Sequence, residues 1–143
     1  MVHWVHSSSH SGVPHDAVRG GHDVDGSPIY VGRAFHDGEN LPAKVIPSKG
    51  CAYVAHDGHE HQKGQYEILV GHHYSWVPSS NGHVPHRAVE SGHTRSGEPL
   101  FVGRGHHAGS LVVGKVHRSH GCLYIPFGGQ EIKIHNYEVL VHH

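Results

Sequence analysis

The sequence DGSPIYVGR at residues 25–33 occurs again, with a few changes, as SGEPLFVGR at residues 96–104. Each stretch places turn residues before a short run of apolar, mostly β-branched or aromatic side chains, which is the pattern of a strand that follows a tight turn. The spacing of 71 residues continues on both sides: residues 13–72 align with residues 84–143 without a gap, and 27 of these 60 pairs, or 45%, are identical. The chain therefore consists of two copies of one unit, which we assign to residues 1–73 and 74–143.

The apolar runs within each copy are short, and none shows a helical period over more than about two turns. Each copy is also glycine-rich and too small to bury a large core alone. We therefore expect an all-β protein in which the two copies pack about a pseudo-twofold axis into one compact unit. The runs lie at residues 29–31, 52–54 and 66–70, and again at 100–102, 123–125 and 137–141.

Composition excludes several classes of function. The 143 residues carry a formal charge of −1, so no uniform basic field favours nucleic acid. No apolar run approaches the roughly 18 residues of a membrane span. The sequence shows no leader peptide, which predicts a cytoplasmic protein or one released without a signal peptide. It also lacks the Gly-x-Ser-x-Gly and phosphate-loop motifs, and we expect no enzymatic activity.

Motifs spread over the second copy indicate a family. They are WVPSSNG at 76–82, VP at 84–85, GEPLFVGR at 97–104 and SHGC at 119–122. Together they closely resemble the DM9 repeat, and two copies in one short chain resemble the tandem-DM9 lectins of molluscs and other invertebrates. The resemblance implies an all-β protein, often a homodimer, that binds mannose-type glycans without calcium in pattern recognition or agglutination. It implies no required cofactor.

The resemblance also suggests where a sugar binds. Sugar hydroxyls both donate and accept hydrogen bonds, so a site needs carboxylates as acceptors and an ammonium or amide as donor. In the family these come from an acidic residue after the first apolar turn and from a later lysine, which match Asp23 and Lys44 here, with Glu39 in the loop between them. The second copy keeps Lys115 but lacks both carboxylates. We expect Asp23, Glu39 and Lys44 to form the main site and Lys115 a weaker one; the alternative is that these are solvated surface residues.

Two further pairs occupy equivalent places in the copies. Trp4 and Trp76 could stack on a sugar face, but their position beside valines at the start of each copy favours anchors in the core or between the copies. Cys51 and Cys122 each follow a glycine beside an apolar run. We expect buried free thiols, with a disulfide across the pseudo-twofold axis as the alternative.

The chain contains 21 histidines, far more than the family requires, and they are spread along the whole sequence. One interpretation is metal binding: His59 and His61 would share a face of a strand and could hold one zinc or other transition-metal ion. The chain would then be a metal-binding or metal-crosslinked structural or adhesive protein, which is the alternative to a lectin. A second interpretation is pH sensing through imidazoles that titrate near pH 6.5. The third is that histidine is a tolerated surface residue.

Overall fold

The structure, a computed structural model, describes residues 2–143. Within this range it consists of fourteen strands and two short 3₁₀ helices, and every strand pair is antiparallel, so the prediction of an all-β protein is confirmed. The first copy contains β1 (His3–Ser8), β2 (Arg19–His22), β3 (Pro28–His36), β4 (Glu39–Ile46), η1 (Pro47–Lys49), β5 (Cys51–His56), β6 (His59–Lys63) and β7 (Gln65–Val70). The second contains β8 (Tyr74–Ser80), β9 (Glu90–His93), β10 (Pro99–His107), β11 (Ser110–His117), η2 (Arg118–His120), β12 (Cys122–Phe127), β13 (Gln130–Ile134) and β14 (Asn136–His142).

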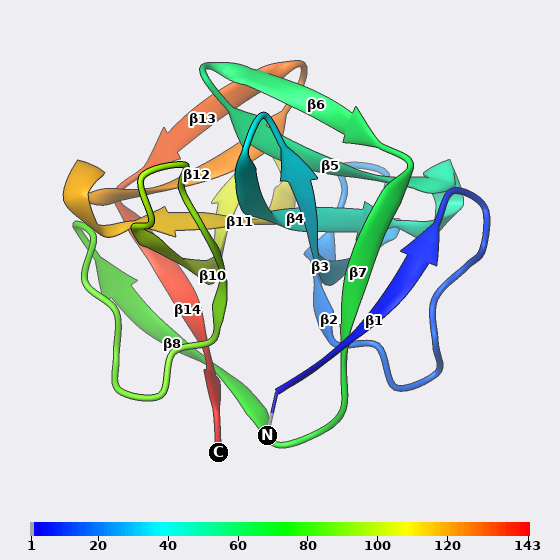
Figure 1. Cartoon of the computed structure of the whole chain (residues 1–143), viewed down its shortest axis with the longest axis horizontal. Helices are drawn as coiled ribbons and strands as arrows, with labels where there is room; N and C mark the ends of the chain where they lie inside the picture. Colours follow the sequence, from blue (N-terminus) through cyan, green and yellow to red (C-terminus); the bar gives the residue numbers. More distant parts are fainter. Residues whose placement is uncertain (1) are drawn as a thin grey trace.

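The two copies contribute strands to a single sheet that closes on itself. Neighbouring strands run from β3 through β2, β11, β12, β13, β6, β5 and β4 and back to β3, a ring of eight strands. Two contacts of this ring, β2 with β11 and β6 with β13, join one copy to the other, and β4 makes a third such contact with β9 outside the ring. In Figure 1 the β1–β7 pair lies at the right and the β8–β14 pair at the lower left, with both chain ends at the bottom.

Two glycines allow the copies to approach this closely. A Cβ atom on Gly21 would lie 2.0 Å from the carbonyl oxygen of Leu111, and one on Gly92 would lie 2.1 Å from the carbonyl oxygen of Asn40. The two contacts are equivalent under the spacing of 71 residues, and both cross from one copy to the other. Neither position can carry a side chain unless the backbone of the opposite copy moves.

The copies also share a hydrophobic core. One cluster of buried side chains combines Ile29 and Leu69 of the first copy with Val102 and Leu140 of the second. Trp4 and Trp76 pack against this same cluster and are partly buried, as expected for anchors rather than exposed sugar platforms. The guanidinium groups of Arg33 and Arg104 lie over these indole rings, each 4.3 Å from the ring centre.

Cys51 and Cys122 are free and buried, so the prediction of buried thiols is confirmed and the disulfide alternative is wrong. Among residues 2–143, no helix has the length and apolar character needed to cross a membrane.

Because the two copies approach each other closely at Gly92, a side chain at this position should reduce stability. We expect Gly92→Ala to destabilise the protein by more than about 4 kcal/mol, because its methyl group would overlap a carbonyl of the other copy. The measurement is the free energy of urea unfolding. Gly109→Ala is the control: unlike Gly92 it has a positive φ, +81°, but the space around its new Cβ is open, so it should cost only about 1–2 kcal/mol. Equal losses in the two variants would contradict the role assigned to Gly92.

Candidate functional site

Each copy buries one lysine near the middle of a strand. Lys44 in β4 and Lys115 in β11 are only 4% and 5% exposed, which is rare for a residue that normally keeps its ammonium in water. The Lys44 amine lies 2.9 Å from Glu60 Oε2, and the Lys115 amine lies 2.9 Å from Glu131 Oε2. Each buried charge therefore has an opposite charge as its partner.

Aromatic rings complete the surroundings of both amines. Lys44 Nζ lies 5.4 Å from the ring centre of Tyr53 and 5.6 Å from that of Phe127, which belongs to the other copy. Lys115 Nζ lies 5.5 Å from the ring centre of Tyr124. These distances are typical of cation–π contacts, so the position of each ammonium is fixed from more than one side.

Glu60 and Glu131 connect the lysines to the opposite copy. The second carboxylate oxygen of Glu60 accepts a hydrogen bond from the Gly129 amide (2.9 Å), and that of Glu131 accepts one from the Gly58 amide (3.0 Å). Reciprocal backbone bonds accompany them: the Glu60 amide donates to the Gly129 carbonyl and the Glu131 amide to the Gly58 carbonyl, both at 3.0 Å. Each lysine site therefore contains backbone from both copies.

The tips of the hairpins make this reach possible. Asp57 and Gly58 join β5 to β6 with φ values of 51° and 84°, and Gly128 and Gly129 join β12 to β13 with 60° and 82°. Two consecutive residues with positive φ form the tight hairpin turn that glycine and aspartate favour. Because the turn is only two residues long, its amide can approach the glutamate of the other copy.

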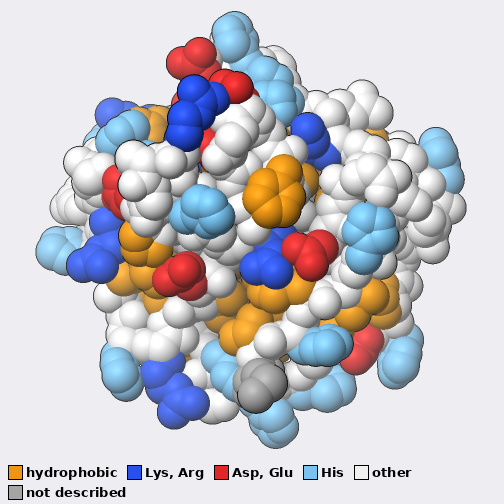
Figure 2. Space-filling model, viewed as in Figure 1, with side chains coloured by type: hydrophobic (Ala, Val, Ile, Leu, Met, Phe, Trp, Pro, Cys, Tyr) orange, Lys and Arg blue, Asp and Glu red, His pale blue; other side chains and the backbone are white. Residues whose placement is uncertain are grey.

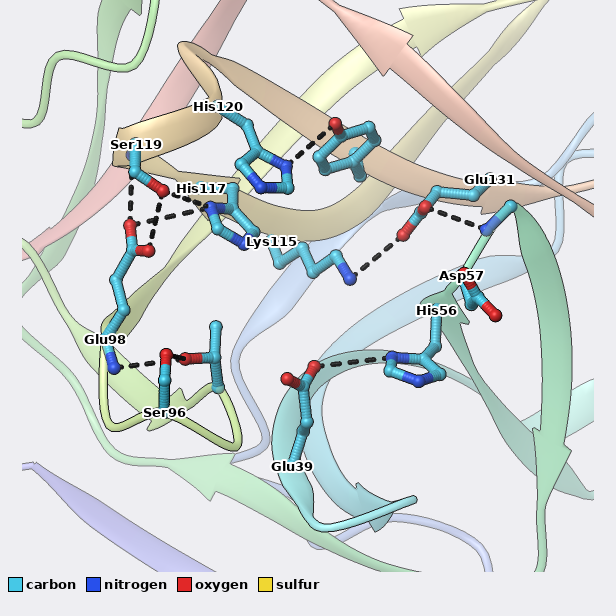
Figure 3. A pocket seen from close by; sticks show the side chains of 13 residues that line it. Glu39, His56, Asp57, Ser96, Glu98, Lys115, His117, Ser119, His120 and Glu131 are labelled. Carbon is cyan, nitrogen blue, oxygen red and sulfur yellow. Dashed lines mark hydrogen bonds and ion pairs between the residues drawn. The ribbon is translucent and has the colours of Figure 1, made fainter.

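A cleft of about 590 Å³ opens above Lys115 (Figure 3). In this view the lysine extends between the imidazoles of η2 and β11 on one side and Glu131 on the other, while Glu39 and His56 approach from the opposite wall. Its lining is almost entirely polar and comes from both copies. The lining residues are Glu39, His56, Asp57 and Gly58 of the first copy and Thr94, Ser96, Glu98, Lys115, His117, Ser119, His120, Tyr124 and Glu131 of the second.

Hydrogen bonds orient the carboxylates on the walls of this cleft. Glu98 accepts from the Ser119 hydroxyl (2.7 Å) and amide (3.0 Å), and lies 3.5 Å from His117 Nδ1. Partial burial opposes ionisation, but the bonds from Ser119 outweigh it and keep the pKa of Glu98 below its ordinary value. On the opposite wall, Glu39 accepts from the Arg95 amide at 2.8 Å and lies 3.3 Å from His56 Nδ1. Both acceptors are thus held in place.

Of the three residues that the sequence grouped as the main site, the structure keeps Asp23 on the side of Lys44 and places Glu39 elsewhere. Asp23 is buried on the Lys44 side, where it accepts from Lys49 Nζ at 2.8 Å. Burial opposes ionisation of Asp23, but Lys49 and, more weakly, Lys44 hold its pKa below the ordinary value. Glu39 instead lines the cleft of Lys115. The physical reason is that the tip of β3–β4 crosses to the second copy, where Asn40 pairs with β9.

Sequence reasoning missed the partners of the lysines. Glu60 and Glu131 are identical in the two copies, as Lys44 and Lys115 are, and this shared identity was the available signal. The role of Glu60 depends on which way its side chain points from β6.

One of the two predicted metal ligands, His61, has other partners. The ring centres of His59 and His61 are 6.3 Å apart, and His61 stacks on His36 with 4.0 Å between ring centres. His61 Nε2 also lies 3.1 Å from the carbonyl oxygen of His56. Within residues 2–143, no group of three or more histidine, cysteine, aspartate or glutamate side chains is arranged to hold a metal ion. Figure 2 shows histidines distributed around this face of the molecule rather than gathered in one patch.

The buried ion pair at Lys115 predicts a large effect of neutralising Glu131. We expect Glu131→Gln to lower the free energy of unfolding by about 3 kcal/mol, because it leaves a buried ammonium without its counter-charge. Urea titration measures this, with Glu90→Gln, at an exposed position of β9, as the control that should change stability by less than about 0.5 kcal/mol. A loss below about 1 kcal/mol at Glu131 would show that the ion pair does not hold the cleft together.

Buried imidazoles predict that acid destabilises the fold. Burial, followed by the neighbouring His120, lowers the pKa of His117, and burial, followed by His61, lowers that of His36. The folded state therefore prefers both rings neutral, while the unfolded chain takes up these protons as the pH falls below about 6.5. Stability from this source is present above pH 6.5 and is lost below it. Urea unfolding at pH 7.5 and 5.5 should show the loss, and His117→Ile, which carries the residue of the first copy, should reduce it; an unchanged pH dependence in that variant would contradict this assignment.

Comparisons with known proteins agree with the repeated architecture. A family profile described as DM9 repeat matches residues 23–134. Natterin-4 of Thalassophryne nattereri is 29% identical over 97% of this chain, which spans 33% of that protein's length. The crystal structure of the nematode sperm cell motility protein MFP2B matches 98% of this chain and 46% of its own, with a TM-score of 0.73 and 16% identity, a likeness of fold alone. Because the family profile covers well over half of the residues, this chain belongs to the DM9 repeat family.

Proposed function

We propose that the chain is a lectin that binds neutral, mannose-type sugars at its buried lysines, without calcium and without catalysis. The observation that carries the proposal is the Lys115–Glu131 pair at the base of an open polar cleft. The family resemblance supplies the sugar class, and the geometry of the cleft supports it.

The cleft offers the complementary groups that a sugar ring needs. Neighbouring hydroxyls of a pyranose each present one donor and two acceptor lone pairs. Lys115 can donate from its ammonium, while Glu39 and Glu98 provide charged acceptors on opposite walls. Hydrogen bonds between charged and neutral groups are stronger than those between neutral groups. Because hydrogen bonds already orient both carboxylates, ordering them for a ligand costs little further entropy.

The contacts of the carboxylates beside the lysines support calcium independence. Calcium sites in proteins use six to eight oxygen ligands, which include carboxylates, carbonyls and waters. Here Glu60 and Glu131 each bind an ammonium and a backbone amide at once. The lysine thus supplies the positive charge at the base of the site.

The two buried lysines give one chain the means to hold two sugars. The Lys44 side has its own buried carboxylate in Asp23, and the Lys115 side has the open cleft. The relative strength expected from the sequence, with Lys115 as the weaker site, remains a prediction. Occupation of both sites, or pairing of chains into a homodimer, would allow agglutination through multivalency and a role in pattern recognition.

Calorimetric titration with mannose in the presence of a chelator tests this proposal. We expect two sites in the wild-type chain, one in Lys44→Met, one in Lys115→Met and none in the double variant, because each substitution removes the ammonium but keeps most of the apolar stem. Lys133→Met, at an exposed lysine of the second copy, should retain both sites.

Circular dichroism of each variant checks that a loss of binding does not result from a loss of the fold. Two outcomes would reject the proposal: a wild-type chain that gives no heat with mannose, or a folded double variant that binds as the wild type does. Heat that requires added zinc would support the metal-binding alternative instead.

A further inference from the structure

The wall of the Lys115 cleft contains a histidine pair that the Lys44 side lacks. His117 at the end of β11 and His120 in η2 stack with 3.6 Å between ring centres and 12° between ring planes. Both line the cleft (Figure 3). The residues 71 positions earlier are Ile46 and Lys49, neither of which titrates between pH 5 and 7.5. The two sites therefore differ in a group that changes charge near neutral pH.

We propose that His117 and His120 make sugar binding at the Lys115 cleft sensitive to protons, so that this cleft releases its ligand on mild acidification while the Lys44 site keeps it. The inference rests on the proposed function. It concerns only how the two sites of one chain differ.

The stacked pair of imidazoles can take up one proton at little cost in free energy, but not two. A second proton would place two like charges a few ångströms apart inside a partly closed cleft, where their repulsion is strong. His117 is 8% exposed, whereas His120 is exposed. The exposed ring is therefore the one free to leave the stack. Its departure would also break the 3.0 Å contact between His120 Nδ1 and the Tyr124 hydroxyl.

Protonation also changes the acceptors available to a sugar. His117 Nδ1 lies 3.5 Å from Glu98 Oε2, so a positive ring would attract the carboxylate that a sugar hydroxyl would otherwise use. Lys115 repels the protonated ring electrostatically, and Glu39 attracts it across the cleft. The other titratable or charged groups on the surrounding elements are His56, Asp57, Arg118, Tyr124 and Glu131.

The titration of an ordinary histidine gives the expected size of the change in sugar affinity. A site that requires one neutral imidazole with a pKa near 6.5 binds about tenfold more weakly at pH 5.5 than at pH 7.5. Burial lowers the pKa of His117, which reduces the loss in this range. We therefore expect mannose affinity at the Lys115 cleft to fall by about threefold to tenfold between these two pH values.

Calorimetry on single-site variants tests the proposal. Lys44→Met isolates the Lys115 cleft, and Lys115→Met isolates the Lys44 site, so each serves as the other's control. We expect the ratio of Kd at pH 5.5 to Kd at pH 7.5 to be about three to ten in Lys44→Met and close to one in Lys115→Met. Adding His117→Ile to Lys44→Met gives the cleft the residue of the first copy and removes the ring beside Glu98, so it should bring the ratio toward one. Asp23→Asn replaces Lys44→Met if the latter does not fold.

The outcomes separate this inference from the proposed function. Equal affinity at both pH values in Lys44→Met would overturn the inference and leave the lectin intact. Binding by the wild type that disappears in Lys44→Met at either pH would also overturn it, because the Lys115 cleft would then hold no sugar. A wild-type chain that does not bind mannose would reject both.

Nuclear magnetic resonance provides a second readout that does not depend on the isoleucine variant. If mannose binds the neutral pair, linkage requires that mannose in turn shift the titration of the His117 ring to lower pH. Imidazole proton signals followed from pH 7.5 to 5.0, with and without saturating mannose, measure this shift in Lys44→Met. Identical titration curves would contradict the inference.

Discussion

The rest of this structure depends on one repeated contact, in which a glutamate of one copy holds a buried lysine of the same copy and a hairpin amide of the other. Glu60 and Glu131 each make both contacts within 3.0 Å. A buried ammonium is tolerated only beside its counter-charge, so the carboxylate cannot leave. The same carboxylate fixes the hairpin that forms the rim of the cleft. The site and the association of the copies therefore rest on the same atoms.

This coupling explains why the two copies can differ at the walls of their sites while keeping the same base. The lysine, the glutamate and the hairpin glycine are identical at Lys44, Glu60 and Gly58 and at their counterparts. The walls have changed from Asp23 and Lys49 on one side to Thr94 and His120 on the other. Substitution at the walls alters which hydroxyls and charges a ligand meets without removing a buried charge partner. Two sites of different character can then arise on one framework.

The sequence predicts the fold more completely than it predicts the site. Turn residues before short β-branched runs are local signals, and the spacing of 71 residues shows directly that they occur twice. The placement of Glu39 had no such signal, because it depends on the pairing of Asn40 with His93 in the other copy. Strand pairing between copies is a long-range property that periodicity along one strand does not encode. For the same reason, Glu60 was visible as a shared residue but not as the partner of Lys44.

The most direct test of this account is a crystal structure of the chain soaked with mannose in chelator. We expect sugar hydroxyls within hydrogen-bond distance of Lys115 Nζ, with contacts to Glu98 of the second copy and Glu39 of the first. A second mannose molecule should contact Lys44, at the equivalent site of the first copy. A sugar bound elsewhere, or held by residues of one copy alone, would contradict the claim that these sites are built from both copies.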